Sequence, residues 1–154
     1  MNILLINGPN LNMLGNRDLG FYGSKSLKEI QEILEQKAKS LSVELLDFQS
    51  NHEGEIVEFI QKNASTASGI IINAGALTHY WISLRDALAD SKLPFVEVHL
   101  SNIYSREEFR RISLLAPIAL GVIAGLKFKG YEYALDYLTL YLNQEGLEWI
   151  FHID

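Results

Sequence analysis

The chain of 154 residues has no cysteine, which excludes disulfide bonds, thiolate catalysis and cysteine-based zinc sites. It also lacks an apolar run of the roughly 20 residues that a membrane-spanning helix needs. Its first residues, MNILLINGPN, have neither the basic region nor the small-residue cleavage site of a signal peptide. Positive charge is scarce, since 13 Lys and Arg stand against 19 Asp and Glu, for a net charge of −6. We therefore expect a cytoplasmic protein with no nucleic-acid or membrane partner.

Short apolar segments alternate with segments of helical periodicity along the chain. A hydrophobic content of 48% at this length indicates one domain, residues 1–154, with a substantial core. Strands are predicted at residues 2–6, 43–49, 69–73, 94–100 and 119–124, and helices at residues 27–40, 53–63, 81–91 and 131–143. This alternation predicts a flavodoxin-like α/β sandwich of three layers, with a five-stranded parallel sheet in the order 2-1-3-4-5.

Two capping boxes mark predicted helix starts. Ser26 is followed three residues later by Glu29, at the beginning of the helix predicted for residues 27–40. Ser105 is followed in the same way by Glu108. The second pair predicts a further short helix after the fourth strand.

The long polar loop after the first strand, residues 8–23, is the most informative segment. It reads GPNLNMLGNRDLGFYG, which is too polar for a strand and too interrupted by glycine and proline for a long helix. It holds Asn10, Arg17 and Tyr22, which offer an amide, a fixed cation and a phenol. Because loops of this length inside compact domains are usually functional, we predict that it forms part of a binding site.

Polar side chains also stand at the ends of the third and fourth predicted strands, at Asn73, His79 and His99. Parallel strands of such folds bind ligands beyond their carboxyl ends. The sequence has no GxxxxGK[ST] and no GxGxxG after the first strand, which excludes the common nucleotide-binding loops. Asn7 and Asn73 stand where a cation-binding receiver domain needs carboxylates, and the two histidines lack a convincing third metal ligand. The residue types present suit metal-free proton transfer near a small polar anion.

Six segments, in order and spacing, resemble the type II 3-dehydroquinate dehydratases. They are GPNLNMLGNRD-x3-YG (8–23), INAGALTH (72–79), LRDAL (84–88), EVHLSNI (97–103), REEFR (106–110) and GVIAGLKFKGYEYAL (121–135). The resemblance implies dehydration of 3-dehydroquinate to 3-dehydroshikimate through an enolate, in the shikimate pathway of aromatic amino acid biosynthesis. It also implies that the reaction needs no cofactor and no metal, and that the protein is a homododecamer built as a tetramer of trimers.

The resemblance assigns catalytic roles to five residues of this sequence. Tyr22 corresponds to the base that removes the C2 proton, and Arg17 corresponds to the lid arginine that keeps this tyrosine ionised. Asn10 corresponds to the residue that positions a water against the developing enolate. His99 corresponds to the acid that protonates the departing C1 hydroxyl, and Glu97 is expected to orient it.

Six further residues are implied in substrate binding: Asn73, His79, Asp86, Leu100, Ser101 and Arg110. Leu100 and Ser101 correspond to the segment that receives the substrate carboxylate, and Asp86 corresponds to a residue that reaches the site of a neighbouring subunit. Without the resemblance, Asp86 would be interpreted as a solvated charge on a helix. Tyr131, like the other tyrosines of the last helix, is expected to be a packing residue.

Three segments depart from the family pattern, namely Asp18-Leu19, Tyr80-Trp81-Ile82 and Lys127-Phe128-Lys129. The family often has a proline after the acidic residue that follows the lid arginine, so we expect a looser lid here. A non-catalytic flavodoxin-like binding module is the competing class, because fold alone does not determine function. The complete set of Tyr22, Arg17 and His99 favours the enzyme.

Overall fold

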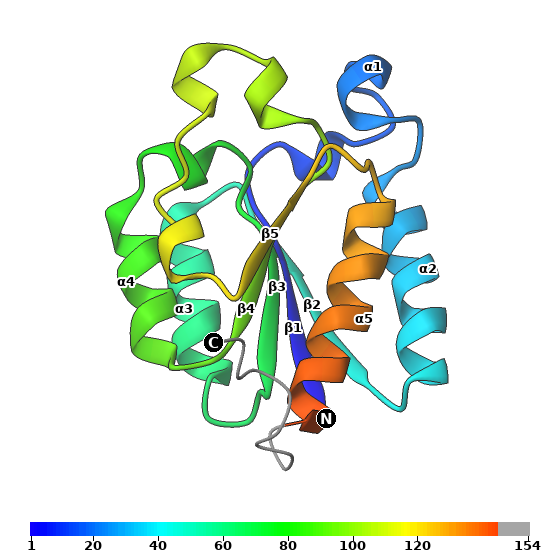
Figure 1. Cartoon of the computed structure of the whole chain (residues 1–154), viewed down its shortest axis with the longest axis vertical. Helices are drawn as coiled ribbons and strands as arrows, with labels where there is room; N and C mark the ends of the chain where they lie inside the picture. The colour runs from blue at the N-terminus through cyan, green and yellow to red at the C-terminus, as the bar shows by residue number, and fades with distance from the viewer. Residues whose placement is uncertain (145–154) are drawn as a thin grey trace, which may run out of the picture.

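The computed structural model describes residues 1–144, which contain a five-stranded parallel sheet (Figure 1). The strands are β1 (Asn2–Asn7), β2 (Glu44–Gln49), β3 (Gly69–Asn73), β4 (Phe95–His99) and β5 (Gly121–Ala124). Their order is β2-β1-β3-β4-β5, and all neighbouring strands are parallel. The predicted flavodoxin-like sheet is therefore confirmed; residues 145–154 of the predicted domain lie outside the described part.

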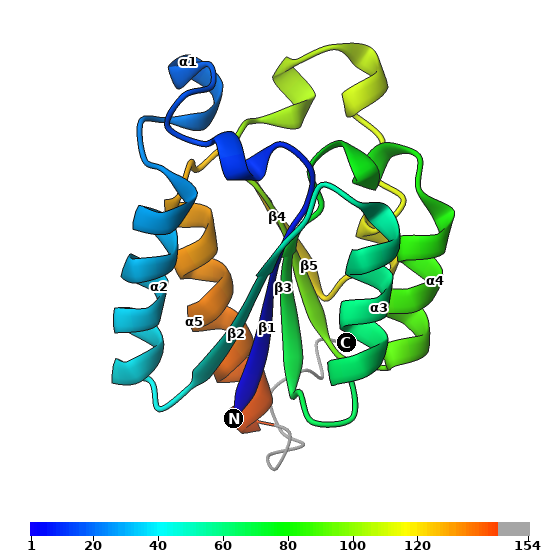
Figure 2. The ribbon, with the colours of Figure 1, turned by 180° about the vertical axis from the view of Figure 1, so that it is seen from behind.

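Four long helices cover the two faces of the sheet. They are α2 (Leu27–Ser40), α3 (Glu53–Asn63), α4 (Ile82–Ser91) and α5 (Lys129–Gln144). The helices α2 and α5 lie on one face, and α3 and α4 lie on the other, which gives the predicted three layers (Figures 1 and 2). Within residues 1–144, none of the helices combines the length and the hydropathy needed to cross a bilayer.

The inner strand β1, which lies between β2 and β3, contributes to both hydrophobic cores. Ile3 and Leu5 pack into the core under α2 and α5, whereas Leu4 and Ile6 pack into the core under α3 and α4. Successive side chains of a strand point to opposite faces, so a strand that is covered on both sides must be apolar throughout. This explains the continuous apolar run at residues 3–6.

One of the two predicted capping boxes is formed. The Ser26 hydroxyl accepts a hydrogen bond from the Glu29 backbone N–H, and the Glu29 carboxylate accepts one from the Ser26 N–H at 2.7 Å. The Ser105 box is wrong. Ser105 ends the 3₁₀ helix η3 (Ile103–Ser105), and its hydroxyl donates backwards to the carbonyl of Asn102. The chain is extended at the next residue, so Glu108 instead begins a second short 3₁₀ helix, η4 (Glu108–Arg110).

The loop after β1 contains more local structure than its composition predicts. It forms the 3₁₀ helix η1 (Leu11–Met13) and a single helical turn, α1 (Leu19–Tyr22). The Asp18 carboxylate caps α1 by accepting hydrogen bonds from the N–H groups of Gly20 and Phe21 at 2.8 and 3.3 Å. Tyr22 is therefore the last residue of a short capped helix. The looser lid that the sequence predicts is a statement about motion and stays a prediction.

The start of this loop lies against the chain that leaves β3. The Gly8 N–H donates to the Asn73 carbonyl at 2.8 Å, and a Cβ atom at position 8 would collide with the backbone of Ala74. Only glycine permits this approach. It brings the loop next to the 3₁₀ helix η2 (Gly75–His79), so polar groups that follow β1 and β3 lie at the same edge of the sheet.

Candidate active site

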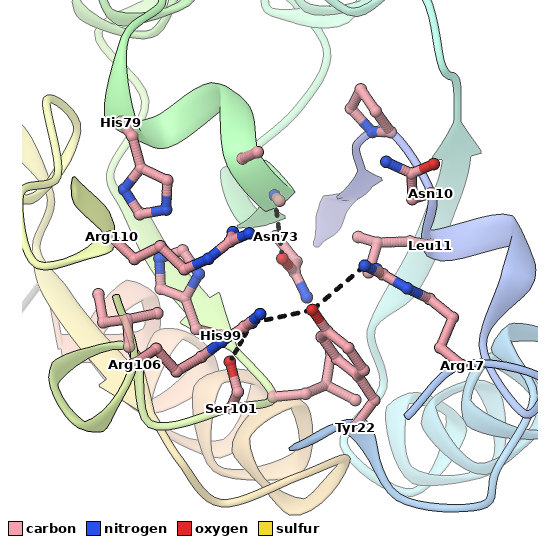
Figure 3. A pocket seen from close by; sticks show the side chains of 15 residues that line it. Asn10, Leu11, Arg17, Tyr22, Asn73, His79, His99, Ser101, Arg106 and Arg110 are labelled. Carbon is pink, nitrogen blue, oxygen red and sulfur yellow. Dashed lines mark hydrogen bonds between the residues drawn. The ribbon is translucent and has the colours of Figure 1, made fainter. Parts of the chain in front are cut away.

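A cavity of about 110 Å³ lies beyond the carboxyl ends of β1, β3 and β4 (Figure 3). This is the position that the strand order predicts for a ligand. The structure brings together around it nine residues that the sequence analysis selected: Asn10, Arg17, Tyr22, Asn73, His79, His99, Leu100, Ser101 and Arg110. Glu97 lies behind His99 and is fully buried. Asp86 is exposed on α4 and is not part of the lining within this chain.

The Tyr22 phenol lies between two arginines. Its oxygen accepts a hydrogen bond from Arg17 at 3.2 Å and a second one from Arg106 at 2.9 Å. The Arg17 guanidinium also lies over the Tyr22 ring, 4.1 Å from its centroid, and Arg106 lies 4.4 Å from the centroid of the Phe21 ring. Two guanidinium groups at this distance stabilise negative charge on the phenol oxygen.

Arg106 is a site residue that the sequence analysis missed. It belongs to the segment REEFR, in which the resemblance pointed to Arg110, and it is 84 residues from Tyr22 in the sequence. It also donates to the Ser101 hydroxyl at 3.3 Å. Its position in the sequence could have indicated it, because Arg106 follows the polar residues after β4 and so lies at the carboxyl end of the strands, where the other candidates lie.

His99 and Glu97 form a buried pair on β4. They are two residues apart and therefore lie on the same face of the strand. His99 Nε2 is 2.7 Å from Glu97 Oε1, which leaves Nδ1 as the ring nitrogen available to the cavity. Burial raises the pKa of Glu97, but hydrogen bonds from His99, Thr78 and Ser113 outweigh it and hold the pKa below its usual value. The pair therefore combines an ionised carboxylate with an imidazole.

His79 lies beside His99 and is held as a neutral ring. The two rings are stacked, with centroids 6.4 Å apart, and His79 Nδ1 is 2.7 Å from the carbonyl of Ile112. Burial lowers the pKa of His79, and the nearby His99 and Arg110 lower it further. Arg110 reaches the cavity while its Nε donates to Glu107 at 2.8 Å, whereas the adjacent Arg111 is exposed and outside the lining. A neutral histidine beside a cation suits contact with hydroxyl groups.

Asn73 is fixed by a buried polar network. Its Nδ2 donates to the Tyr131 hydroxyl at 2.9 Å, and this hydroxyl donates to Asn7 Oδ1 at 2.6 Å. Asn73 Oδ1 accepts from the Gly75 N–H at 3.1 Å. Tyr131 is buried, as predicted, but it is more than a packing residue, because it fixes the side chain that faces the cavity.

The cavity concentrates positive charge in an acidic chain. Arg17, Arg106 and Arg110 all line it, while the net charge of the whole chain is −6. Asn10 is held at the rim in a left-handed conformation, with its N–H donating to Asn51 Oδ1 at 2.9 Å. Among residues 1–144 there is no group of three or more metal-ligating side chains. Three guanidinium groups, a phenol and an imidazole therefore line one small cavity.

Comparison with known proteins identifies the family. The family model described as dehydroquinase class II matches residues 1–139. A protein named 3-dehydroquinate dehydratase from Prochlorococcus marinus subsp. pastoris is 56% identical over 143 residues, which are 93% of this chain and 98% of the relative. One of the same name from Roseiflexus castenholzii is also 56% identical, over 90% of this chain and 88% of the relative.

A solved structure agrees with the sequence matches. The type II dehydroquinase from Butyrivibrio crossotus has a TM-score of 0.87 at 46% identity, over 90% of this chain and 97% of that chain. The family that these sequence and structure matches share is the one that the six segments resemble. The chain belongs to the class II dehydroquinase family.

Proposed function

We propose that this protein dehydrates 3-dehydroquinate to 3-dehydroshikimate through an enolate, in the shikimate pathway. The observation that carries the proposal is the pairing of two proton-transfer groups across one cavity. Tyr22 is held by two guanidinium groups on one side, and His99 is backed by the buried Glu97 carboxylate on the other. A β-elimination of water beside a ketone needs such a base and such an acid.

In the first step, the Tyr22 oxygen removes the proton from C2 of the substrate, and the electron pair of the C–H bond forms the enolate of the adjacent ketone. Arg17 and Arg106 stabilise the phenolate that performs this step. Asn10, at the rim of the cavity, positions a water that donates to the enolate oxygen.

In the second step, the enolate expels the C1 hydroxyl as His99 donates a proton to it, which forms the C1–C2 double bond and water. The Glu97 carboxylate stabilises the imidazolium that precedes this transfer. Afterwards Tyr22 carries one additional proton and His99 lacks one, and proton exchange with solvent restores both. No step in this proposal uses a metal or a cofactor.

The remaining predicted residues are proposed to bind the substrate. Its hydroxyl groups contact Asn73, His79 and Arg110, and its carboxylate lies at Leu100 and Ser101, where the lining turns away from β4. A location in the cytoplasm stays a prediction of the sequence.

The competing proposal is a binding module that holds a polar anion without changing it. Mixing the protein with 3-dehydroquinate and following ultraviolet absorbance separates the two, because the product is a conjugated enone and the substrate is not. We expect a continuous rise in absorbance with catalytic amounts of protein. Binding heat without any rise in absorbance, from correctly folded protein, would favour the binding module.

Replacement of Arg106 should slow the reaction. Because Arg106 donates to the Tyr22 oxygen at 2.9 Å, Arg106→Ala removes a charge-assisted hydrogen bond, worth about 1.5–3 kcal/mol. We expect kcat to fall roughly 10- to 100-fold. The matched control is Arg111→Ala, which removes an exposed arginine five residues away and should leave kcat unchanged. Equal effects of the two substitutions would remove Arg106 from the proposed site.

Assembly is the next prediction. The resemblance ties Asp86 to the site of a neighbouring subunit, and Asp86 is exposed and does not line the cavity of its own chain. We propose a homododecamer, a tetramer of trimers, whose activity needs at least the trimer. Sedimentation with activity measured across the boundary tests this prediction, and a fully active monomer would contradict it.

A further inference from the structure

We propose that Thr78 and Ser113 are positioning residues that act on His99 through Glu97, by fixing the Glu97 carboxylate with two hydroxyl donors. The proposal rests on the function proposed for His99. It concerns the interior of the site, because neither Thr78 nor Ser113 lines the cavity.

Glu97 is a carboxylate with no exposed surface and four polar contacts. Its Oε1 accepts from the Thr78 hydroxyl and lies 2.7 Å from His99 Nε2. The Ser113 hydroxyl lies 2.9 Å from Oε1 and 2.8 Å from Oε2. A buried carboxylate is tolerated only when such partners replace water. Three segments that are distant in sequence therefore meet at this group.

The hydroxyl groups of Thr78 and Ser113 both donate to Glu97. Each hydroxyl has a single hydrogen. Ser113 Oγ already accepts from the N–H groups of Leu115 and Ala116, at 3.1 and 2.9 Å, so it uses its own hydrogen on the carboxylate. The Thr78 and Ser113 oxygens are 2.8 Å apart, so the two hydroxyl groups lie side by side against Oε1. The carboxylate is thus fixed in orientation relative to His99.

The Thr78 and Ser113 hydroxyl groups are neutral donors, so they leave the negative charge of Glu97 available to His99, the proposed acid. Within residues 1–144, His99 is the only titratable group in hydrogen-bond contact with Glu97. The neutral His79 ring stacks beside His99, and Arg110 lies near His79; neither is hydrogen-bonded to the Glu97 carboxylate in the described part of the chain. Hydroxyl groups hold the carboxylate without neutralising it, so its full negative charge stabilises the His99 imidazolium. A lysine or arginine in their place would compete with His99.

The segment that carries Ser113 is itself tied to the sheet edge. The Leu114 N–H donates to the Thr78 carbonyl at 2.8 Å, and Arg85 donates to the Leu114 carbonyl at 2.5 Å. This segment follows η4, which carries Arg110. The same contacts therefore fix the position of the segment that carries Arg110 relative to the Glu97–His99 pair.

The test is Thr78→Val, which keeps the shape of the side chain and removes the hydroxyl. Loss of a hydrogen-bond donor to the carboxylate should raise the pKa of Glu97. In an NMR titration of the Glu97 carboxyl carbon, the midpoint of the chemical-shift change should therefore move to higher pH. It should also lower kcat roughly tenfold with little change in KM. Exchange of the substrate C2 proton with deuterium should persist, because Tyr22 is untouched. Thr78→Ser restores the hydroxyl and should restore both readouts.

Ser113→Ala provides a second variant with the same expected shifts, and Ser40→Ala is the control, since the Ser40 hydroxyl only donates to the Lys37 carbonyl at the end of α2. An unchanged Glu97 titration in both Thr78→Val and Ser113→Ala would overturn the proposal, as would a parallel loss of turnover and C2 exchange. The NMR readout needs no substrate. Failure of the proposed function, seen as wild-type protein without turnover, is therefore distinguishable from failure of this inference.

Discussion

Tyr22→Phe is expected to retain substrate binding and to lose nearly all turnover. The substitution keeps the ring that packs against the core and removes the oxygen that accepts from Arg17 and Arg106. General-base catalysis contributes roughly 10²- to 10⁴-fold, so kcat should fall at least into this range. Exchange of the substrate C2 proton with solvent deuterium should vanish together with turnover, because both begin with the same proton transfer.

The matched control for this variant is Tyr137→Phe, which removes a phenol from the exposed side of α5 and should change neither readout. Binding of 3-dehydroquinate, measured by calorimetry, shows whether the pocket of Tyr22→Phe is intact. If Tyr22 only shields the cavity, kcat will fall modestly and C2 exchange will persist. Persistent exchange would exclude Tyr22 as the base.

His99→Ala is expected to lower kcat by roughly 10²- to 10⁴-fold and to leave the fold intact. Hydroxide is a poor leaving group, so the second step needs the proton that His99 supplies. C2 exchange should persist in this variant, since the first proton transfer does not use the imidazole. Both variants should therefore lose turnover, but C2 exchange should vanish in Tyr22→Phe and persist in His99→Ala.

A second substitution at this position controls for the buried charge. Removal of His99 leaves Glu97 with only its two hydroxyl partners, whereas His99→Gln keeps an N–H donor for the carboxylate and cannot act as an acid. Both variants should be equally inactive. His52→Ala removes an exposed histidine at the start of α3 and should be fully active. Near-normal turnover in His99→Gln would remove His99 from the acid role.

The regular elements of the fold could be predicted because local and tertiary signals agree there. The helices predicted for residues 27–40 and 53–63 and the strand for residues 69–73 have the bounds of α2, α3 and β3. The Ser105 capping box failed because a local motif specifies a helix only if the chain continues as one. There the Asn102 side chain starts η3 earlier, by accepting from the N–H of Tyr104.

The single turn α1 was not predictable from periodicity, because four residues carry no helical repeat. Its cap, Asp18, belongs to the segment where this chain departs from the family pattern. The contact between Lys127 and the carbonyl of Gly20 also helps to hold it, across 107 residues of sequence. A contact between residues so far apart in the sequence can be recognised only once the fold shows that the loops after β1 and β5 lie at the same end of the sheet.

The site was predictable to the extent that strand ends converge. This rule selected the residues after β1, β3 and β4 that now surround the cavity. The same rule could have selected Arg106, which follows β4 and lines the cavity. It could not find Thr78 or Ser113, because their relevance depends on which atoms they face. Arg106 and Arg110 share one short segment, and only the fold shows that both reach the cavity. Asp86 lies outside the cavity of its own chain, so its role depends on assembly.

Mass spectrometry of the reaction in D₂O tests the division of labour between Tyr22 and His99 most directly. Wild-type protein, Tyr22→Phe and His99→Ala are each incubated with 3-dehydroquinate, and dehydrated product and deuterated substrate are measured in the same samples. We expect product from the wild type, neither species from Tyr22→Phe, and deuterated substrate with almost no product from His99→Ala. Deuterated substrate in the Tyr22→Phe sample, or no product from the wild type, would contradict the account.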